Sequence, residues 1–224
     1  MLIEIDRDLW TCERPLKFLG VEVGCRMTVV RLSGGRLLLH SPVRPDEALR
    51  REVDALGQVR WVIAPNRFHH LFAGDWLAAY PSAEGYAAPG LAKKRPDVRF
   101  AGVLGDEPAG WGDEVSQVAW RGSPALNEVA FLHQPSRTLI VADLVHNVGD
   151  EKPLLSRVFY GLLGGYGGFK TNLVDRMAVR DRPAARASLD RILAWDFDRV
   201  ILSHGRVLDG NGHAALRDAY RWLR

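Results

Sequence analysis

Hydrophobic and polar positions along the first third of the chain predict a hairpin, a helix and a buried strand. The segments 26–32 (RMTVVRL) and 36–42 (RLLLHSP) flank Ser-Gly-Gly, which is typical of a β-hairpin. In 44–57 the apolar residues recur at helical spacing, and Gly57 stands where such a helix would end. The run 59–65 (VRWVIAP) is apolar after its arginine and predicts a strand covered on both faces.

The rest of the chain continues to alternate between the two kinds of element. We expect helices at 71–80, 181–196 and 212–224, and strands at 84–89, 115–122, 127–134, 137–145 and 197–205. The glycine-rich segment 150–171 is interpreted as an insertion over one face of the fold. Because there is neither an exact repeat nor a linker, the pattern predicts one α/β domain over 1–224.

Composition limits the partners that we expect. The 224 residues are 47% hydrophobic, which is enough for a large core, and the formal charge of +3 comes from 30 basic and 27 acidic side chains. The basic residues are scattered rather than massed in a stripe, so we expect no nucleic-acid partner. The longest apolar stretch, 158–169, is shorter than the roughly 20 residues of a membrane span, so we expect no membrane partner.

The N-terminus and the cysteines favour a cytoplasmic protein. The first ten residues, MLIEIDRDLW, carry charge from the fourth position and do not resemble a secretory signal. Cys12 and Cys25 have no partner at short spacing, so they indicate neither a disulfide framework nor a thiolate zinc site. We expect both thiols to be buried and without a role.

Polar residues follow three of the predicted strands at the point where each strand ends. Asn66 to His70 follow the strand 59–65 and include two adjacent histidines; Asp143 and His204 follow later strands. In α/β sheets, ligands gather outside the carboxyl ends of strands. Carboxylate and imidazole groups suit a hard or borderline cation. The sequence therefore predicts a metal or polar site where these strand ends meet.

Several motifs in this order resemble the metallo-β-lactamase superfamily over nearly the whole chain: LLLHSP, VIAPN followed by HH, RGSPALNEVAF, SRTLIVADLV and VILSHG. Within it, APNRFHHLF, RGSPALNEVAF and RTLIVADLVHN are similar to a bacterial family known as domain of unknown function 4336. The resemblance implies a four-layer αββα sandwich with the site between the two sheets. It implies no particular activity.

The metal ligands of the superfamily are only partly present. Its His-x-His-x-Asp-His box falls, without gaps, on Asn66, Phe68, His70 and Leu71. The segment RGSPALNE lacks the next histidine, and His40 stands where an aspartate is usual. Asp143 matches the carboxylate that bridges two metal ions in the family, and His204 matches the last ligand.

The resemblance therefore implies that the first of the two metal positions is lost and the second is kept. His70, Asp143 and His204 would hold one ion, with His69 as an added ligand or as a replacement for His70. Two histidines and a carboxylate suit zinc, which is the first expectation, or iron or manganese. In the alternative without metal, His70 donates a structural hydrogen bond to Asp143.

Four further residues are candidates for the wall of a substrate pocket: Asn66, Glu128, His146 and Asn147. Glu128 could act as a base or ligand, or form an ion pair with Arg121. His146 lies three residues after Asp143, where some relatives carry a cation that grips substrate. The glycines after residue 160 predict a mobile flap or a plain flexible insertion.

Two functions of different classes remain open. The first is a hydrolase with one metal ion, in which His70, Asp143 and His204 are catalytic and the substrate is an ester, lactone, thioester or amide. The second is a non-catalytic protein of the same fold that binds a small molecule or a partner without metal. The sequence leaves the oligomeric state open.

Overall fold

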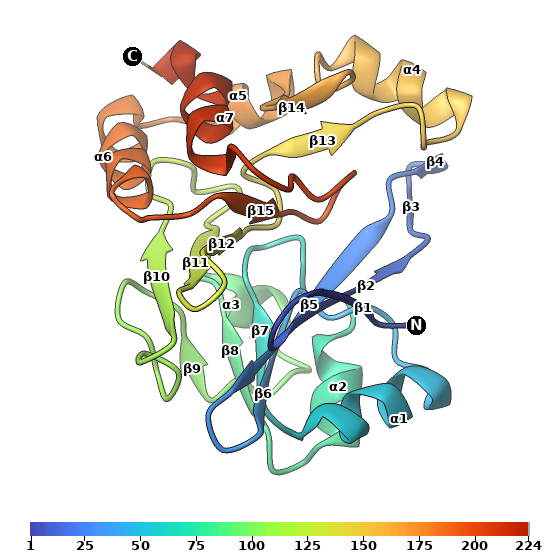
Figure 1. The fold of residues 1–224 in the computed structure, drawn as a ribbon. Coiled ribbons are helices and arrows are strands. Elements are labelled where there is room, and N and C mark those ends of the chain that lie inside the picture. The colour runs from blue at the N-terminus through green and yellow to red at the C-terminus, as the bar shows by residue number, and fades with distance from the viewer. Residues whose placement is uncertain (224) are drawn as a thin grey trace.

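The computed structural model describes residues 1–223, which form two β-sheets that lie face to face with helices outside them (Figure 1). The larger sheet has the order β1-β2-β5-β6-β7-β8-β9, and the smaller sheet has the order β10-β11-β12-β15. The larger sheet contains β1 (Ile3–Asp6), β2 (Leu9–Arg14), β5 (Cys25–Leu32), β6 (Arg36–His40), β7 (Gln58–Ala64), β8 (Glu84–Ala87) and β9 (Gly102–Val103). The smaller contains β10 (Val115–Ala119), β11 (Val129–His133), β12 (Thr138–Ile140) and β15 (Arg199–Ile201).

Two short ribbons and seven α-helices complete the structure of residues 1–223. The ribbons pair β3 (Lys17–Phe18) with β4 (Val21–Glu22), and β13 (His146–Val148) with β14 (Gly168–Lys170). The helices are α1 (Glu47–Leu56), α2 (Ala73–Ala79), α3 (Leu91–Lys94), α4 (Leu154–Leu162), α5 (Leu173–Ala178), α6 (Arg182–Leu193) and α7 (Gly212–Ala219), followed by a 3₁₀ turn at Arg221–Leu223.

Alternation along the strands divides the core into three layers of apolar contact. In β6, Leu37 and Leu39 pack toward α1 and α2, whereas Leu38 packs into the space between the sheets. In β11, Phe131 faces that same space and Leu132 faces α6 and α7. Because successive strand side chains point to opposite faces, each sheet is covered on both sides. The result is the expected four-layer αββα sandwich.

The local predictions for the first third of the chain are confirmed. The hairpin forms between β5 and β6, and α1 occupies most of 44–57. Asp46 caps α1, since its Oδ1 accepts the N–H of Leu49 at 2.7 Å, and Gly57 ends it. Cys12 and Cys25 are free and buried, as expected.

Two parallel strand pairs bring the polar strand ends to one edge of the sandwich. β6 pairs with β7 in parallel, and β12 pairs with β15 in parallel. The carboxyl ends of parallel neighbours meet at the same edge of a sheet. The residues after β6 and β7 therefore lie together, as do Asp143 after β12 and His204 after β15.

Two segments differ from the prediction. The strand expected over 137–145 ends at Ile140, and pairing resumes only in the separate β13–β14 ribbon. The segment 150–171, interpreted as an insertion over one face of the fold, contains the helix α4, which was not predicted and which covers the top of Figure 1 together with β14 and α5. Leu154 to Leu162 lacks glycine and proline except for Gly161 near its end, so its helix is compatible with the sequence.

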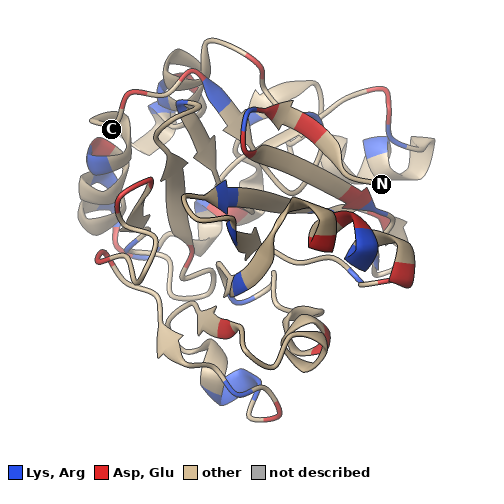
Figure 2. Ribbon diagram, turned by 60° about the horizontal axis from the view of Figure 1, so that its bottom comes forward, with Lys and Arg blue, Asp and Glu red and all other residues tan. Residues whose placement is uncertain are grey.

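Charge is spread over the molecule as the sequence indicated. Figure 2 shows basic and acidic residues interspersed along the ribbon. Within residues 1–223, no helix is both long and apolar enough to cross a membrane.

Candidate metal centre

Three ligand atoms from three strand ends converge at the edge between the sheets. His69 Nε2 lies 3.2 Å from Asp143 Oδ1, and His204 Nε2 lies 3.1 Å from the same oxygen. The two Nε2 atoms are 3.2 Å apart. All three side chains are nearly buried. This trio is a compact set of two imidazoles and one carboxylate, as predicted for a mononuclear site, but with His69 in the place expected for His70.

The turn after β7 explains which histidine faces the site. Asn66 Oδ1 accepts the backbone N–H groups of both Phe68 and His69 at 2.8 Å, which tightens the turn and directs His69 inward. The adjacent His70 points elsewhere: its Nδ1 lies 3.1 Å from Nη1 of Arg95. The expectation that His70 is a ligand, or that it bonds Asp143 directly, is therefore corrected.

The environment of His70 is also unsuited to a positive charge. Burial, followed by the nearby cations Lys94 and Arg95, lowers the pKa of His70 to about 4. A neutral His70 can accept a hydrogen bond from the Arg95 guanidinium, which matches the observed contact. His70 therefore stabilises the loop rather than the trio.

The outer nitrogens of the two inward histidines are held by polar partners. His69 Nδ1 lies 2.8 Å from the Ser41 hydroxyl, and His204 Nδ1 lies 3.3 Å from the Val23 carbonyl. A carbonyl only accepts hydrogen bonds, so His204 Nδ1 carries a proton and, in the neutral ring, Nε2 presents a lone pair to Asp143. Metal-bound histidines in proteins are oriented in this way by the second ring nitrogen.

The charges of the trio depend on one another. Burial opposes ionisation of Asp143, but the adjacent His69 and His204 outweigh it and hold the pKa of Asp143 well below its usual range. Burial would lower the pKa of His69, yet Asp143 raises it overall; for His204 burial prevails and the pKa is lowered. The anionic Asp143 thus faces at least one imidazole lone pair, an arrangement that a cation between them would stabilise.

The spacing of the trio fits such a cation. Tetrahedral zinc with bonds of about 2.0–2.1 Å places its ligand atoms about 3.3–3.4 Å apart. The three separations here are 3.1 to 3.2 Å, so a small outward shift would suffice. The donor types, the spacing and the oriented outer nitrogens together suit a divalent ion.

Two polar residues predicted for the pocket wall, Asn66 and Glu128, form hydrogen bonds that hold Asp143 in place. Asn66 Nδ2 donates to Asp143 Oδ2 and to Glu128 Oε2, both at 2.8 Å. Glu128 also accepts the backbone N–H groups of Ala142 and Asp143 at 2.7 and 2.8 Å. The alternative ion pair with Arg121 is wrong, because Arg121 pairs with Asp106 instead. Glu128 thus fixes the peptide that carries Asp143.

The two pocket-wall candidates that follow Asp143, His146 and Asn147, form different contacts. The His146 ring stacks on His204 with centroids 5.7 Å apart, and its Nε2 lies 3.0 Å from Asp175 Oδ2. Its Nδ1 is buried without a hydrogen-bond partner within residues 1–223. The Asn147 amide instead donates to the carbonyl of Arg206 at 2.9 Å, so it braces the loop after His204.

Sequence reasoning missed Arg26, whose side chain is almost entirely buried beneath the last strand end. Its guanidinium donates to the carbonyls of Leu202 and Gly205 on either side of His204, and to the Glu13 carboxylate. A single arginine inside the strand RMTVVRL gives no local sign of this role, since the two carbonyls that it binds lie more than 170 residues away.

His40, which stands where the superfamily has an aspartate, is buried and lies edge-on to Phe131. Its Nε2 has no hydrogen-bond partner within residues 1–223, and burial lowers the pKa of His40 to about 3. Neutral His40 is therefore compatible with the fold, and protonated His40 is not.

We expect His40 to contribute to acid denaturation. Its folded-state pKa lies below the unfolded value of 6.5, so its contribution to stability is present above pH 6.5 and is lost as the pH falls toward 3. The full loss, reached below pH 3, is about 5 kcal/mol. Urea unfolding between pH 7.5 and 4 should show a shallower decline for His40→Leu than for the wild type; parallel curves would contradict this assignment.

With the geometry established, comparison with solved structures identifies the fold. A metallo-β-lactamase from Pontibacter korlensis has a TM-score of 0.67 over 100% of this chain and 98% of its own, at 14% identity. The chain has the metallo-β-lactamase fold. A Pseudomonas aeruginosa metallo-β-lactamase in its mono-zinc form has a TM-score of 0.65 over 100% of this chain and 96% of its own, at 11% identity.

The same fold appears in a protein of another kind. A metal-soaked flavodiiron core from Synechocystis has a TM-score of 0.68 at 14% identity, covering 100% of this chain and 60% of its own. Within the sequence, residues 6–92 match the model of a domain of unknown function, DUF4336. No curated protein sequence matches the chain significantly. At such identities the metallo-β-lactamase fold is shared, and activity has to be argued from the site.

Proposed function

We propose that the protein is a hydrolase that uses one divalent metal ion, held by His69, Asp143 and His204. The convergence of these three ligand atoms within 3.2 Å of one another carries the proposal. Asn66 and the exposed Phe68 supply no ligand for a second ion. Zinc is the proposed ion, with iron and manganese as alternatives, since all three accept imidazole and carboxylate ligands.

When bound, such an ion lowers the pKa of a water molecule and polarises a carbonyl group, which suits hydrolysis of an ester, lactone, thioester or amide. The chain itself orients the ligands: Ser41 and the Val23 carbonyl fix the two imidazoles, and Asn66 fixes the carboxylate. His146 Nε2 lies 3.0 Å from Asp175 Oδ2, and the charge of Asp175 raises the pKa of His146 against the effect of burial. We propose that the unpartnered Nδ1 of His146 forms a hydrogen bond with a polar group of the substrate.

A metal-free binding protein is the second candidate. Both histidines lie within hydrogen-bond distance of Asp143 Oδ1, so a proton on His69 could take the place of the ion. The raised pKa of His69 favours that proton. The two candidates differ in one quantity, the amount of metal bound per chain.

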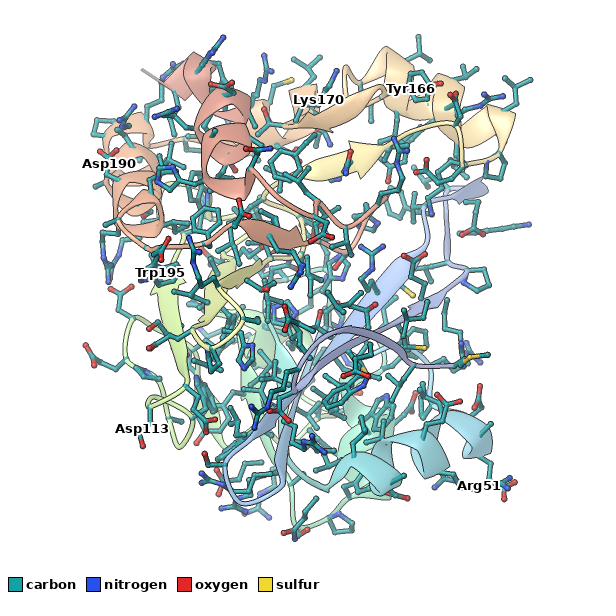
Figure 3. The ribbon with its side chains drawn as sticks, in the orientation of Figure 1. Arg51, Asp113, Tyr166, Lys170, Asp190 and Trp195 are labelled. Atoms are coloured by element: carbon teal, nitrogen blue, oxygen red, sulfur yellow. The ribbon has the colours of Figure 1, made fainter. Side chains whose placement is uncertain are left out.

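The test is metal content together with hydrolysis. Purified protein is expected to contain about one equivalent of zinc, iron or manganese by plasma mass spectrometry, and to hydrolyse at least one of a panel of esters, lactones, thioesters and amides. Asp143→Asn should lose both metal and hydrolysis. Asp113→Asn, an exposed carboxylate at the lower left of Figure 3, should lose neither. A wild-type protein that stays metal-free when offered zinc would overturn the hydrolase and leave the binding protein.

A further inference from the structure

Large apolar side chains gather on the outer face of the segment that holds α4 and α5. On α4 they are Leu154, Leu155, Val158 and Leu162; on α5 they are Leu173, Val174 and Met177. The tip of the β3–β4 hairpin adds Phe18 and Leu19. We call these nine residues the apolar rim, and each of them is between 50% and 84% exposed.

The orientation of α4 is the reverse of that expected for a helix on a protein surface. Its exposed leucines and valine follow one another at helical spacing and share one face. The inward face instead carries Ser156, which donates to the Glu22 carbonyl at 2.7 Å, and Tyr160. Monomeric proteins rarely expose a contiguous apolar patch of this kind unless it binds something.

The parts of the rim are joined by direct contacts. α4 and α5 meet where the Leu173 N–H donates to the Leu163 carbonyl at 2.8 Å. The hairpin lies against α4 through the Ser156–Glu22 hydrogen bond. Figure 1 shows α4, β14 and α5 along one outer edge, with β4 beneath α4. The rim is therefore one surface rather than scattered exposed residues.

The charges of the same segment are almost all positive. Between residues 152 and 180 stand five basic residues and one acidic residue: Lys152, Arg157, Lys170, Arg176, Arg180 and Asp175. The acidic one, Asp175, is turned inward, where it bonds His146 and the N–H of Asn172. The flanking acidic residues are engaged elsewhere: Asp150 pairs with Arg157, Glu151 pairs with Arg206, and Asp181 caps α6. Within residues 1–223 the other four basic residues of the segment form no ion pair and leave it an excess of positive charge.

The exposed apolar side chains and the excess of basic residues distinguish between possible binding partners of the rim. A second copy would bring one basic rim against another, because a symmetric dimer joins the same patch on both chains. A small ligand would need a hollow, and two hollows of the molecule, of about 360 and 440 Å³, are lined by residues outside the rim. An anionic lipid surface accepts apolar side chains at its acyl boundary and lysine or arginine at its headgroups.

We propose that the apolar rim docks the protein on the surface of an anionic lipid bilayer. The expectation of no membrane partner rested on the lack of a segment long enough to span a bilayer, but a surface-bound helix needs no span. The proposal does not depend on the metal centre. Docking would nevertheless place that centre near the headgroups, since Asp175 of α5 contacts His146 beside His204.

The test is co-flotation of the purified protein with vesicles. The wild type is expected to float with vesicles containing equal parts of phosphatidylglycerol and phosphatidylcholine, and to stay behind with pure phosphatidylcholine. Leu155→Ser combined with Leu162→Ser should weaken binding at least about tenfold, because both side chains would leave the acyl boundary. Arg180→Gln and added salt should weaken it to a smaller extent.

The matched control is Val103→Ser, which removes another apolar side chain that is 63% exposed but lies on β9, outside the rim. It should bind vesicles as the wild type does. Circular dichroism would confirm that every variant is folded. Absence of flotation by the folded wild type would overturn the proposal. So would a concentration-dependent dimer that disappears in the double leucine variant, since the rim would then bind a second copy.

Discussion

His69→Ala is expected to abolish metal binding, whereas His70→Ala, one residue further along the chain, is expected to retain it. His69 Nε2 lies 3.2 Å from Asp143 Oδ1, while His70 Nδ1 is engaged with Arg95. Removing one of three protein ligands should weaken zinc affinity at least about 100-fold, more than the loss of an outer hydrogen bond does. Metal content after dialysis and calorimetric titration with zinc would measure the difference.

The adjacent pair makes this a sensitive comparison. Both variants lose one imidazole of the same turn, so a general effect on the loop would appear in both. His70→Ala should lower the melting temperature slightly, because Arg95 loses an acceptor. Equal metal loss in the two variants would show that the turn after β7 rearranges on binding. Full retention of metal in His69→Ala would contradict the proposal that His69 is a metal ligand.

The sequence could not distinguish these two histidines. An ungapped alignment with the His-x-His-x-Asp-His box selects His70, and neighbouring residues of a turn can face opposite sides. What directs His69 inward is the Asn66 side chain, which binds two backbone N–H groups of the turn. That contact depends on the conformation of the turn, which the pattern of residue types does not specify.

The fold was more predictable than the site. The hairpin of β5 and β6, the capped helix α1 and the strand β7 follow from local periodicity and from Asp46 and Gly57. Asp143 and His204 could be anticipated as well, since each follows an apolar strand. Contacts across long stretches of chain could not: the partners of Glu128 and Arg26 were missed, because neither residue differs locally from an ordinary strand residue.

α4 illustrates a different limit of sequence analysis. Its apolar residues recur at helical spacing, which by itself predicts that they face the core. In the structure they face outward, and the inward positions are taken by Ser156 and Tyr160. The pattern could therefore reveal an amphipathic segment but not which of its faces the rest of the protein covers.

Glu128→Gln is expected to destabilise the protein by about 3 kcal/mol at pH 5, although it preserves the shape of the side chain. Both oxygens of the Glu128 carboxyl group accept N–H groups, from Ala142 on one side and from Asp143 and Asn66 on the other. An amide must present its own N–H₂ to one of these donors. Urea unfolding with a chelator present, so that no metal contributes, would measure the change.

The pH dependence of this loss of stability shows whether Glu128 acts as a titrating buried carboxyl group or only as a hydrogen-bond acceptor. Burial, and then the charge of Asp143, raises the pKa of Glu128 from 4.5 to about 7. Because the folded-state pKa exceeds the unfolded value, the wild type gains stability below pH 4.5 and loses that gain as the pH rises through 7. Glutamine does not titrate, so the difference in free energy of unfolding between the wild type and Glu128→Gln should decrease as the pH rises from 4.5 to 7.

Arg121→Ala is the matched control, since an ion pair with Arg121 was the other interpretation of Glu128. The Arg121 guanidinium is mostly exposed and pairs with Asp106, so its removal should cost less than about 1 kcal/mol at any pH. A large effect of Arg121→Ala on the free energy of unfolding would favour the ion pair between Glu128 and Arg121. A Glu128→Gln variant as stable as the wild type would mean that the peptide of Asp143 needs no buried acceptor, and the trio would then lack the support that holds its carboxylate in place.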